Sequence, residues 1–280
     1  MIKADATTES GLFYAKAAKE RTQRSSTCCS ASPAMAAGYE QESLDQVPRE
    51  AVESSFGCGD PVAFASVQPG QTVLDLGCGA GLDLILAAEK VGSTGMVIGV
   101  DASEEMLALA ESNAERAGIS DCVDLRPGQI EELPVDDRSV DWVISNCVVN
   151  LSTDKSKVFQ EIRRVLKPGA SAMISDLVAE DLPEWVNAHS DLYSACVSGA
   201  VSERRYLELA GEAGFTDSSV MARMHYDASL VRGLLSEALP VDIDAVAQRL
   251  GMNREDLLAM AASDLAGRIT SVRFCFTAPS

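Results

Sequence analysis

Residues 72–101 place glycines and carboxylates where a ligand could contact the backbone. An apolar run from Val73 predicts a buried parallel strand, and the turn Gly-Cys-Gly-Ala-Gly that follows it begins at Gly77. Glycine has no Cβ, so such a turn can be tight and can touch a ligand closely. A second predicted strand ends on Asp101, twenty residues after Gly81, where a carboxylate can accept hydrogen bonds from two ribose hydroxyls. The stretch therefore predicts a βαβ unit with a ligand site at the carboxyl ends of its strands.

Eight cysteines are the other residues that could do chemistry. They show no C-x-x-C spacing, so neither a zinc ribbon nor a thioredoxin motif is expected, and with only two histidines a His-rich metal site is not expected either. Cys58, Cys147 and Cys196 lie 89 and 49 residues apart, a spacing that proves nothing by itself. Taken singly, each would more often be a buried, inert cysteine.

The sequence around these cysteines predicts where they lie. Cys58 stands between two glycines in the loop FGCGDP, which predicts an accessible thiol and a loop that can cover the ligand site. Cys147 follows a predicted strand at its carboxyl end, where open α/β sheets place their chemistry. Cys196 falls near the end of a helix predicted to reach Gly199. Cys28 and Cys29 lie in a Ser/Ala-rich segment predicted to be mobile; such neighbours rarely bond to each other, so they are either incidental or partners for another group.

Alternating apolar strands and amphipathic helices must position these residues. Ser103 is predicted to cap a helix that ends near Gly118, and two helical patterns and a terminal strand follow residue 226. The further predicted strands are 122–125, 140–145, 170–176, 218–224 and 271–277, and the further helices are 155–166, 202–213, 228–239 and 243–260.

Composition restricts the classes of partner. The chain has 280 residues, 46% of them hydrophobic, and 42 acidic against 23 basic residues give a formal charge of −19. Such a surface repels nucleic acid and anionic membranes, so neither is expected as a partner. No apolar run approaches the roughly 20 residues of a membrane span, and no signal peptide is visible. We expect a cytoplasmic protein, in which structural disulfides are rare.

The glycine turn distinguishes two classes of nucleotide-binding enzyme. The dinucleotide pattern G-x-G-x-x-G is not met, because the third glycine comes one residue early. The pattern D-x-G-x-G-x-G with a later acidic strand end resembles class I S-adenosylmethionine-dependent methyltransferases, with a nicotinamide enzyme as the alternative. The resemblance implies an α/β, Rossmann-like fold with a mostly parallel seven-stranded sheet and helices on both faces. It implies these cofactor-binding residues: Asp75, Gly77, Cys78, Gly79, Asp101, Ala102, Met106, Gln129, Ile130 and Asn146.

Three cysteine-containing motifs narrow the resemblance. FGCGDP, ISNCVVNL and YSACVSGA, with GQIEELP between them, are similar to the arsenite methyltransferase family over residues 56–216, with a weaker match in SVRFCFTAP. The resemblance implies that Cys58, Cys147 and Cys196 bind trivalent arsenic and that Cys28 or Cys29 takes part in redox chemistry. It also implies methylated arsenicals and S-adenosylhomocysteine as products, with thioredoxin or glutathione as the reductant that reopens a disulfide.

Two other functions stay open at this stage. A class I methyltransferase acting on a small organic acceptor would need a base rather than the cysteines, and a metalloid-binding protein without turnover would not need an intact cofactor site. We expect an N-terminal helical and mobile segment over 1–55, a methyltransferase domain over 56–225 and a C-terminal α+β extension over 226–280. The extension is either a small domain or an elaborated final strand pair.

Overall fold

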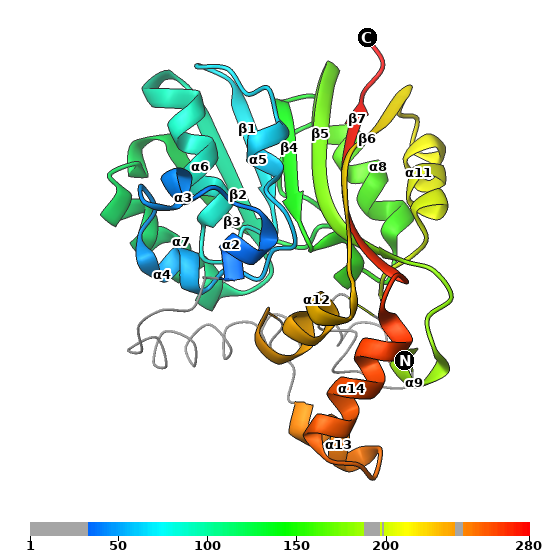
Figure 1. The fold of residues 1–280 in the computed structure, drawn as a ribbon. Helices are drawn as coiled ribbons and strands as arrows, with labels where there is room; N and C mark the ends of the chain where they lie inside the picture. The colour runs from blue at the N-terminus through cyan, green and yellow to red at the C-terminus, as the bar shows by residue number, and fades with distance from the viewer. Residues whose placement is uncertain (1–32, 188–196, 198, 239–242) are drawn as a thin grey trace.

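A seven-stranded sheet forms the centre of the molecule (Figure 1). The computed structural model describes residues 33–187, 197, 199–238 and 243–280, so the predictions for Cys28, Cys29 and Cys196 fall outside the described residues. The strand order is β3-β2-β1-β4-β5-β7-β6, with parallel pairing from β3 to β5 and antiparallel pairing of β7 with both neighbours. The strands are β1 (Thr72–Leu76), β2 (Met96–Asp101), β3 (Val123–Pro127), β4 (Val140–Asn146), β5 (Leu166–Ala179), β6 (Asp217–His225) and β7 (Ile269–Thr277). The predicted fold class is confirmed.

Alternate residues of the parallel strands pack on opposite faces, because successive side chains of a strand point to opposite sides. Leu74 packs in the cluster that includes α8 and α11, whereas Val73 packs with α6 and the N-terminal helices. Both faces are therefore buried, as expected for a parallel sheet. The helices that cover the sheet are α2 (Pro33–Ala37), α3 (Gln41–Leu44), α4 (Arg49–Glu53), α5 (Pro61–Phe64), α6 (Leu82–Val91), α7 (Glu104–Ala117), α8 (Lys155–Val165) and α11 (Glu203–Glu212). Short 3-10 turns lie at Gly92–Thr94, Ser120–Cys122 and Val149–Leu151.

The predicted helix boundaries follow local capping. Ser103 accepts a hydrogen bond from the Met106 amide, and Gly118 ends α7 in the left-handed conformation, as the sequence predicts. Asp60 caps α5 by accepting from the Ala63 amide, with Pro61 at the first helical position.

Some predicted elements differ in the structure. The helical pattern over 243–260 is two helices, because Gly251 takes a positive φ and Asn253 caps a new helix. The fifth strand is longer than predicted: β5 begins at Leu166 and pairs with β4 again at Ser171, after a register shift that accommodates the Lys-Pro-Gly turn.

Residues between β6 and β7 form a helical layer beyond one end of the sheet (Figure 1). Its elements are α12 (Ala228–Gly233), a π-helix (Leu234–Ala238), α13 (Ile243–Arg249) and α14 (Arg254–Leu265), and α9 (Glu184–Asn187) lies nearby. Because these helices lie between β6 and β7 in the sequence, the layer is an insertion between the last two strands.

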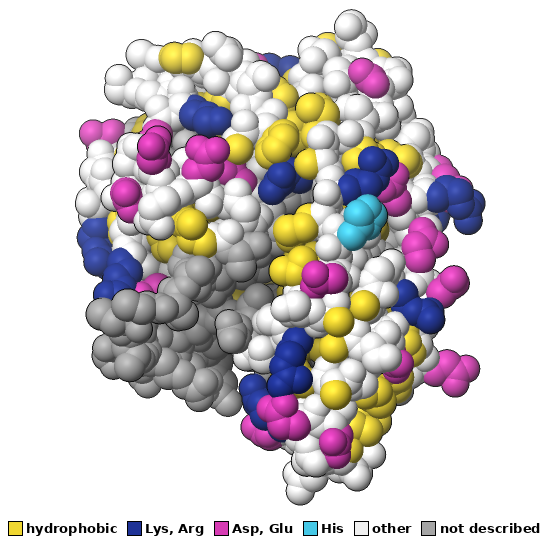
Figure 2. Space-filling model, viewed as in Figure 1, with side chains coloured by type: hydrophobic (Ala, Val, Ile, Leu, Met, Phe, Trp, Pro, Cys, Tyr) yellow, Lys and Arg dark blue, Asp and Glu magenta, His cyan; other side chains and the backbone are white. Residues whose placement is uncertain are grey.

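Figure 2 shows how charge is distributed on one face of the described residues. On the face in Figure 2, acidic and basic side chains are interspersed, and the basic ones form no continuous patch over the described residues. Among the described helices, none combines the length and apolarity needed to cross a bilayer.

Candidate active site

One cavity opens at the carboxyl ends of β1, β2 and β4. All ten residues predicted to bind a cofactor line it, and Cys147 lies in its wall. Phe56 and Gly57 also line it, so the predicted position of their loop over the ligand site is confirmed. Residues that the sequence analysis did not select, Asp83, Glu131 and Ser152 among them, complete the wall.

The glycine turn after β1 forms the floor of this cavity. Gly77, Gly79 and Gly81 all have positive φ, a conformation that residues with a Cβ rarely adopt. The buried Asn113 amide of α7 donates to the Ala80 carbonyl (3.0 Å) and fixes the turn from behind. Burial raises the pKa of the Cys78 thiol well above its ordinary value, with the Asp101 and Asp75 carboxylates adding to the shift. Cys78 is thus a neutral thiol packed in the turn.

Carboxylates dominate the electrostatics of the cavity. Its wall includes Asp75, Asp83, Asp101 and Glu131, and no Lys, Arg or His is among the described residues that line it. Burial, followed by repulsion from Asp83 and Asp101, raises the pKa of Asp75 well above its usual range. Burial likewise raises the pKa of Asp83 to about 7. A cation in this cavity would favour the ionised form of these carboxyls, whereas no basic residue of the described lining would neutralise a pyrophosphate.

Two carboxylates differ in their hydrogen bonding. Asp101 accepts from the Gly79 amide and from the Ser103 amide, each at 2.9 Å, so β2 is tied to the glycine turn. Asp75 Oδ2 is buried and has no hydrogen-bond partner in the protein. A buried, unsatisfied acceptor of this kind indicates a place for a ligand donor.

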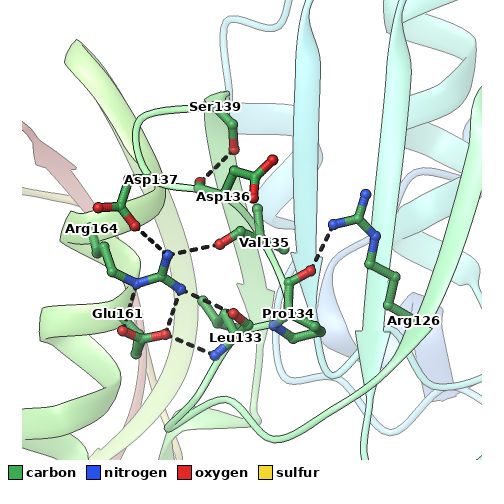
Figure 3. A network of polar contacts seen from close by, with 9 residues as sticks. All are labelled: Arg126, Leu133, Pro134, Val135, Asp136, Asp137, Ser139, Glu161 and Arg164. Carbon is green, nitrogen blue, oxygen red and sulfur yellow. Dashed lines mark hydrogen bonds and ion pairs between the residues drawn. The ribbon is translucent and has the colours of Figure 1, made fainter.

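A loop from Gly128 to Val135 forms the side wall of the cavity, with Gln129 exposed and Ile130 buried. Arg164 of α8 anchors this loop by donating to the carbonyls of Leu133 (3.0 Å) and Val135 (2.8 Å), as Figure 3 shows.

The Arg164 guanidinium also bonds both oxygens of Glu161 at 2.7 Å and one oxygen of Asp137 at 2.7 Å. Glu161 in turn accepts from the Leu133 amide at 2.8 Å (Figure 3). The hydrogen bond from Arg164 lowers the pKa of Glu161, so the pair is ionised. The network fixes the loop from one helix.

Asn146, at the end of β4, connects the cavity to the loop of Cys58. Its Nδ2 lies within hydrogen-bond distance of Tyr39 Oη (2.8 Å), the Gly59 carbonyl (2.6 Å) and Asp83 Oδ2 (3.0 Å). Its Oδ1 accepts from the Cys58 amide at 2.9 Å. Tyr39 also donates to Asp83 Oδ1 at 2.7 Å, which closes a buried network.

Cys58 and Cys147 meet beside this network. They form a disulfide with a Cα–Cα distance of 6.1 Å, although they are 89 residues apart in the sequence. Cys147 has a φ of +58°, which is rare for a residue with a side chain and turns the chain sharply after β4. The structure brings together two of the three cysteines that motif resemblance selected.

The Cys58 thiol is not accessible, contrary to the prediction from its glycine neighbours. Cys58 is only 4% exposed. Gly57 and Gly59 serve close packing instead: a Cβ on Gly57 would lie 2.3 Å from Asn146, and one on Gly59 would lie 2.8 Å from the Ser175 hydroxyl. The Ser271 hydroxyl donates to the Cys58 carbonyl at 2.6 Å and holds the loop against β7.

Asp176, on β5, is a third polar group at this position that the sequence analysis did not select. A carboxylate oxygen of Asp176 and the sulfurs of Cys58 and Cys147 lie within 4.8 Å of one another. Burial raises the pKa of this fully buried carboxyl to about 7. The sequence offered one sign of this residue, an acidic side chain in the carboxyl-terminal half of a predicted strand. That sign is weak unless the neighbouring cysteines are known.

The remaining described cysteines lie elsewhere. Cys122 is buried in a 3-10 turn just before β3 rather than in the predicted strand, because β3 begins at Val123. Cys275 is half-buried in β7. Both are free, as is Cys78.

Comparisons with known proteins identify the family. The methyltransferase-domain family matches residues 68–214. An arsenite methyltransferase from Halobacterium salinarum is 44% identical over 67% of this chain and 49% of its own length, and one from Aquipseudomonas alcaligenes is 37% identical over 73% and 60%. The chain spans about half the length of the first of these curated relatives.

A solved structure supports the same assignment of the fold. The crystal structure of an arsenic(III) S-adenosylmethionine methyltransferase from Chlamydomonas reinhardtii superposes with a TM-score of 0.66 at 30% identity, covering 87% of this chain and 74% of that one. The resemblance to arsenite methyltransferases found from the motifs is thus confirmed over most of the chain. From its glycine turn, its sheet and the match over 68–214, the chain belongs to the methyltransferase-domain family.

Proposed function

We propose that this chain transfers a methyl group from S-adenosylmethionine to trivalent arsenic bound by Cys58, Cys147 and Cys196. The observation that carries the proposal is the contact between Cys58 and Cys147, of which Cys147 lies in the wall of an acidic cavity. Nothing in the local sequence of either cysteine requires the two sulfurs to lie together, whereas binding of one soft ion by both thiolates does.

The cavity fits a cationic cofactor. The unsatisfied, buried oxygen of Asp75 offers an acceptor to an ammonium group, and Asp101 offers acceptors to ribose hydroxyls. The loop with Gln129 and Ile130 offers a polar and an apolar contact to adenine. When bound, S-adenosylmethionine supplies an electrophilic methyl group on a positively charged sulfur. The chain's own residues hold and orient it and exclude the anionic nicotinamide cofactors.

The cysteines suit trivalent arsenic as the substrate. Thiolate is the soft ligand that proteins offer to a soft centre, and binding removes the thiol protons, so no separate base is required. Three thiolates leave the arsenic lone pair uncovered. Val197, next in the chain to Cys196, packs in the same cluster as Cys58 and Cys147, which supports Cys196 as the third ligand. Holding both reactants in line supplies much of the rate enhancement.

A thiol reductant is part of the proposal. Methylation uses the lone pair and leaves arsenic oxidised by two electrons; two cysteine thiols can return those electrons and form a disulfide. The Cys58–Cys147 disulfide must itself be opened before arsenic can bind there. Cys28 or Cys29 would act as partners of Cys58 in later rounds, and thioredoxin or glutathione would restore the thiols. We propose methylated arsenicals and S-adenosylhomocysteine as products.

The test is arsenic speciation after incubation with arsenite, S-adenosylmethionine and a thiol reductant. We expect methylated arsenic from the wild type and at least a hundredfold less from Cys147→Ser and Cys196→Ser. Cys275→Ser, which removes a half-buried thiol far from the cavity wall, is the matched control and should keep full activity. Methylation of an organic acceptor with equal rates in all variants would replace arsenic as the substrate.

A further inference from the structure

Asp176 is a fully buried carboxylate that the proposed reaction has not used. Its oxygens accept four hydrogen bonds: from the Asn150 side chain (2.7 Å), the Asn150 amide (3.2 Å), the Leu177 amide (2.9 Å) and the Tyr206 hydroxyl (3.0 Å). Four donors on two oxygens favour the ionised carboxylate. Burial opposes these donors and raises the pKa of this carboxyl to about 7, so its ionised form needs a further compensating charge.

In the described part of the chain, no Lys or Arg nitrogen lies within ion-pair distance of Asp176. The charge of Lys155 lowers the pKa of Asp176, and its ammonium group donates to the carbonyls of Asn150 and Ser152. What Asp176 does face is the pair of sulfurs, within 4.8 Å.

The reaction proposed above creates a positive charge at that position. The arsenic lone pair forms the As–C bond while the C–S bond of the sulfonium breaks and its electron pair returns to sulfur. The sulfonium becomes a neutral thioether, and arsenic bound by three thiolates, neutral before the step, acquires one positive charge. A fixed negative charge beside arsenic is therefore worth more at the transition state than in the ground state.

We propose that the Asp176 carboxylate is a catalytic group that stabilises the positive charge developing on thiolate-bound arsenic. The inference rests on the proposed function. It accounts for a carboxylate at this position, because an asparagine would carry no charge and would have only one oxygen to accept from the four donors. Tyr206 and the Asn150 amides act as positioning groups, because they hold the carboxylate toward the sulfurs.

The test separates the charge from the hydrogen-bonded structure. Asp176→Asn removes the charge and keeps the shape but gives up hydrogen bonds at one oxygen, whereas Tyr206→Phe removes one hydrogen bond and keeps the charge. For both, the arsenite dissociation constant of the reduced protein is measured by equilibrium dialysis, together with the single-turnover rate of arsenic methylation at saturating arsenite and S-adenosylmethionine.

We expect Asp176→Asn to bind arsenite within about threefold of the wild type and to react roughly a hundredfold more slowly. Tyr206→Phe should react within about fivefold of the wild-type rate. A wild-type rate in Asp176→Asn, or an arsenite affinity that falls as much as the rate, would overturn the inference while leaving the proposed function in place. A wild type that binds S-adenosylmethionine but yields no methylated arsenic would overturn both.

Discussion

The two halves of the site are built on different principles. The cofactor half, formed by residues 72–106 and 128–131, leaves hydrogen-bonding capacity open: Asp75 keeps a buried oxygen without a partner, and its pKa and that of Asp83 are raised by burial. The sulfur half, formed by Cys58, Cys147 and Asp176, is internally satisfied, with four donors on the carboxylate and a disulfide between the thiols. One half is ready to receive a cation, and the other must first be opened by reduction.

The halves also differ in what encloses them. Loops and the glycine turn line the cofactor half. The sulfur half packs against the helical insertion, since Cys58 and Cys147 share a cluster with Leu235 and Leu265. Asn146 is the residue that touches both halves, through Asp83 and through the Cys58 amide.

Removing Asn146 should have the largest effect, because it breaks both halves at once. Asn146→Ala deletes its contacts to Tyr39, Gly59, Asp83 and Cys58, and buried groups left without partners destabilise a protein. We expect a loss of about 2–4 kcal/mol in the free energy of unfolding. Titration should show affinities for S-adenosylmethionine and for arsenite both about tenfold weaker, an order-of-magnitude expectation for a lost network.

Asn253→Ala is the control for this prediction. Asn253 caps α14 by accepting from the Asp256 amide, far from the cavity wall, so its loss should cost about 1 kcal/mol of stability and leave both affinities unchanged. If Asn146→Ala weakens one ligand only, the two halves are independent.

A smaller effect should reveal a buried proton in the cofactor half through the pH dependence of stability. Burial raises the pKa of Asp83 to about 7, in a setting that includes Tyr39, Asp60 and Asp75. Between about pH 4 and pH 7 the folded protein holds a proton there that the unfolded chain has released, so stability falls as pH rises through this range. One such group gives at most about 1.4 kcal/mol per pH unit.

Asp83→Asn should therefore show a shallower decline in unfolding free energy between pH 5 and pH 7 than the wild type, measured by urea denaturation. Adding S-adenosylmethionine, a cation, favours the ionised carboxylate and should flatten the wild-type decline, whereas neutral-sulfur S-adenosylhomocysteine should flatten it less. Parallel curves for the two proteins would show that Asp83 does not hold this proton.

The sequence predicted the cofactor half far better than the sulfur half, for a physical reason. A glycine turn and an acidic strand end lie within thirty residues, and local backbone geometry fixes their relation, so Asp75, Gly79 and Asp101 could be expected at one cavity, which they line. The sulfur half is assembled from separate elements, and only motif resemblance selected Cys58 and Cys147. No local sequence pattern marks Asp176 or Tyr206, because the residues that they contact are brought to them only by tertiary packing. The burial of Cys58 was missed for the same reason: its glycines permit close packing against Asn146 and Ser175 rather than exposure.

The smallest expected effect tests whether α8 influences ligand binding in the cofactor half alone. Arg164→Gln removes most of the hydrogen bonds that hold the carbonyls of Leu133 and Val135 (Figure 3). Arg164 is partly exposed, so solvent screens its ion pairs and the loss in stability should stay near 1 kcal/mol. A looser loop binds adenine less well, so the dissociation constant for S-adenosylmethionine should rise about fivefold, which is about 1 kcal/mol. The arsenite dissociation constant should not change. Arg205→Gln, which removes a surface pair with Glu212, is the control and should alter neither constant. If Arg164→Gln weakened the binding of both ligands equally, the loop would support the whole cavity. The two halves would then differ in their chemistry but would not be structurally independent.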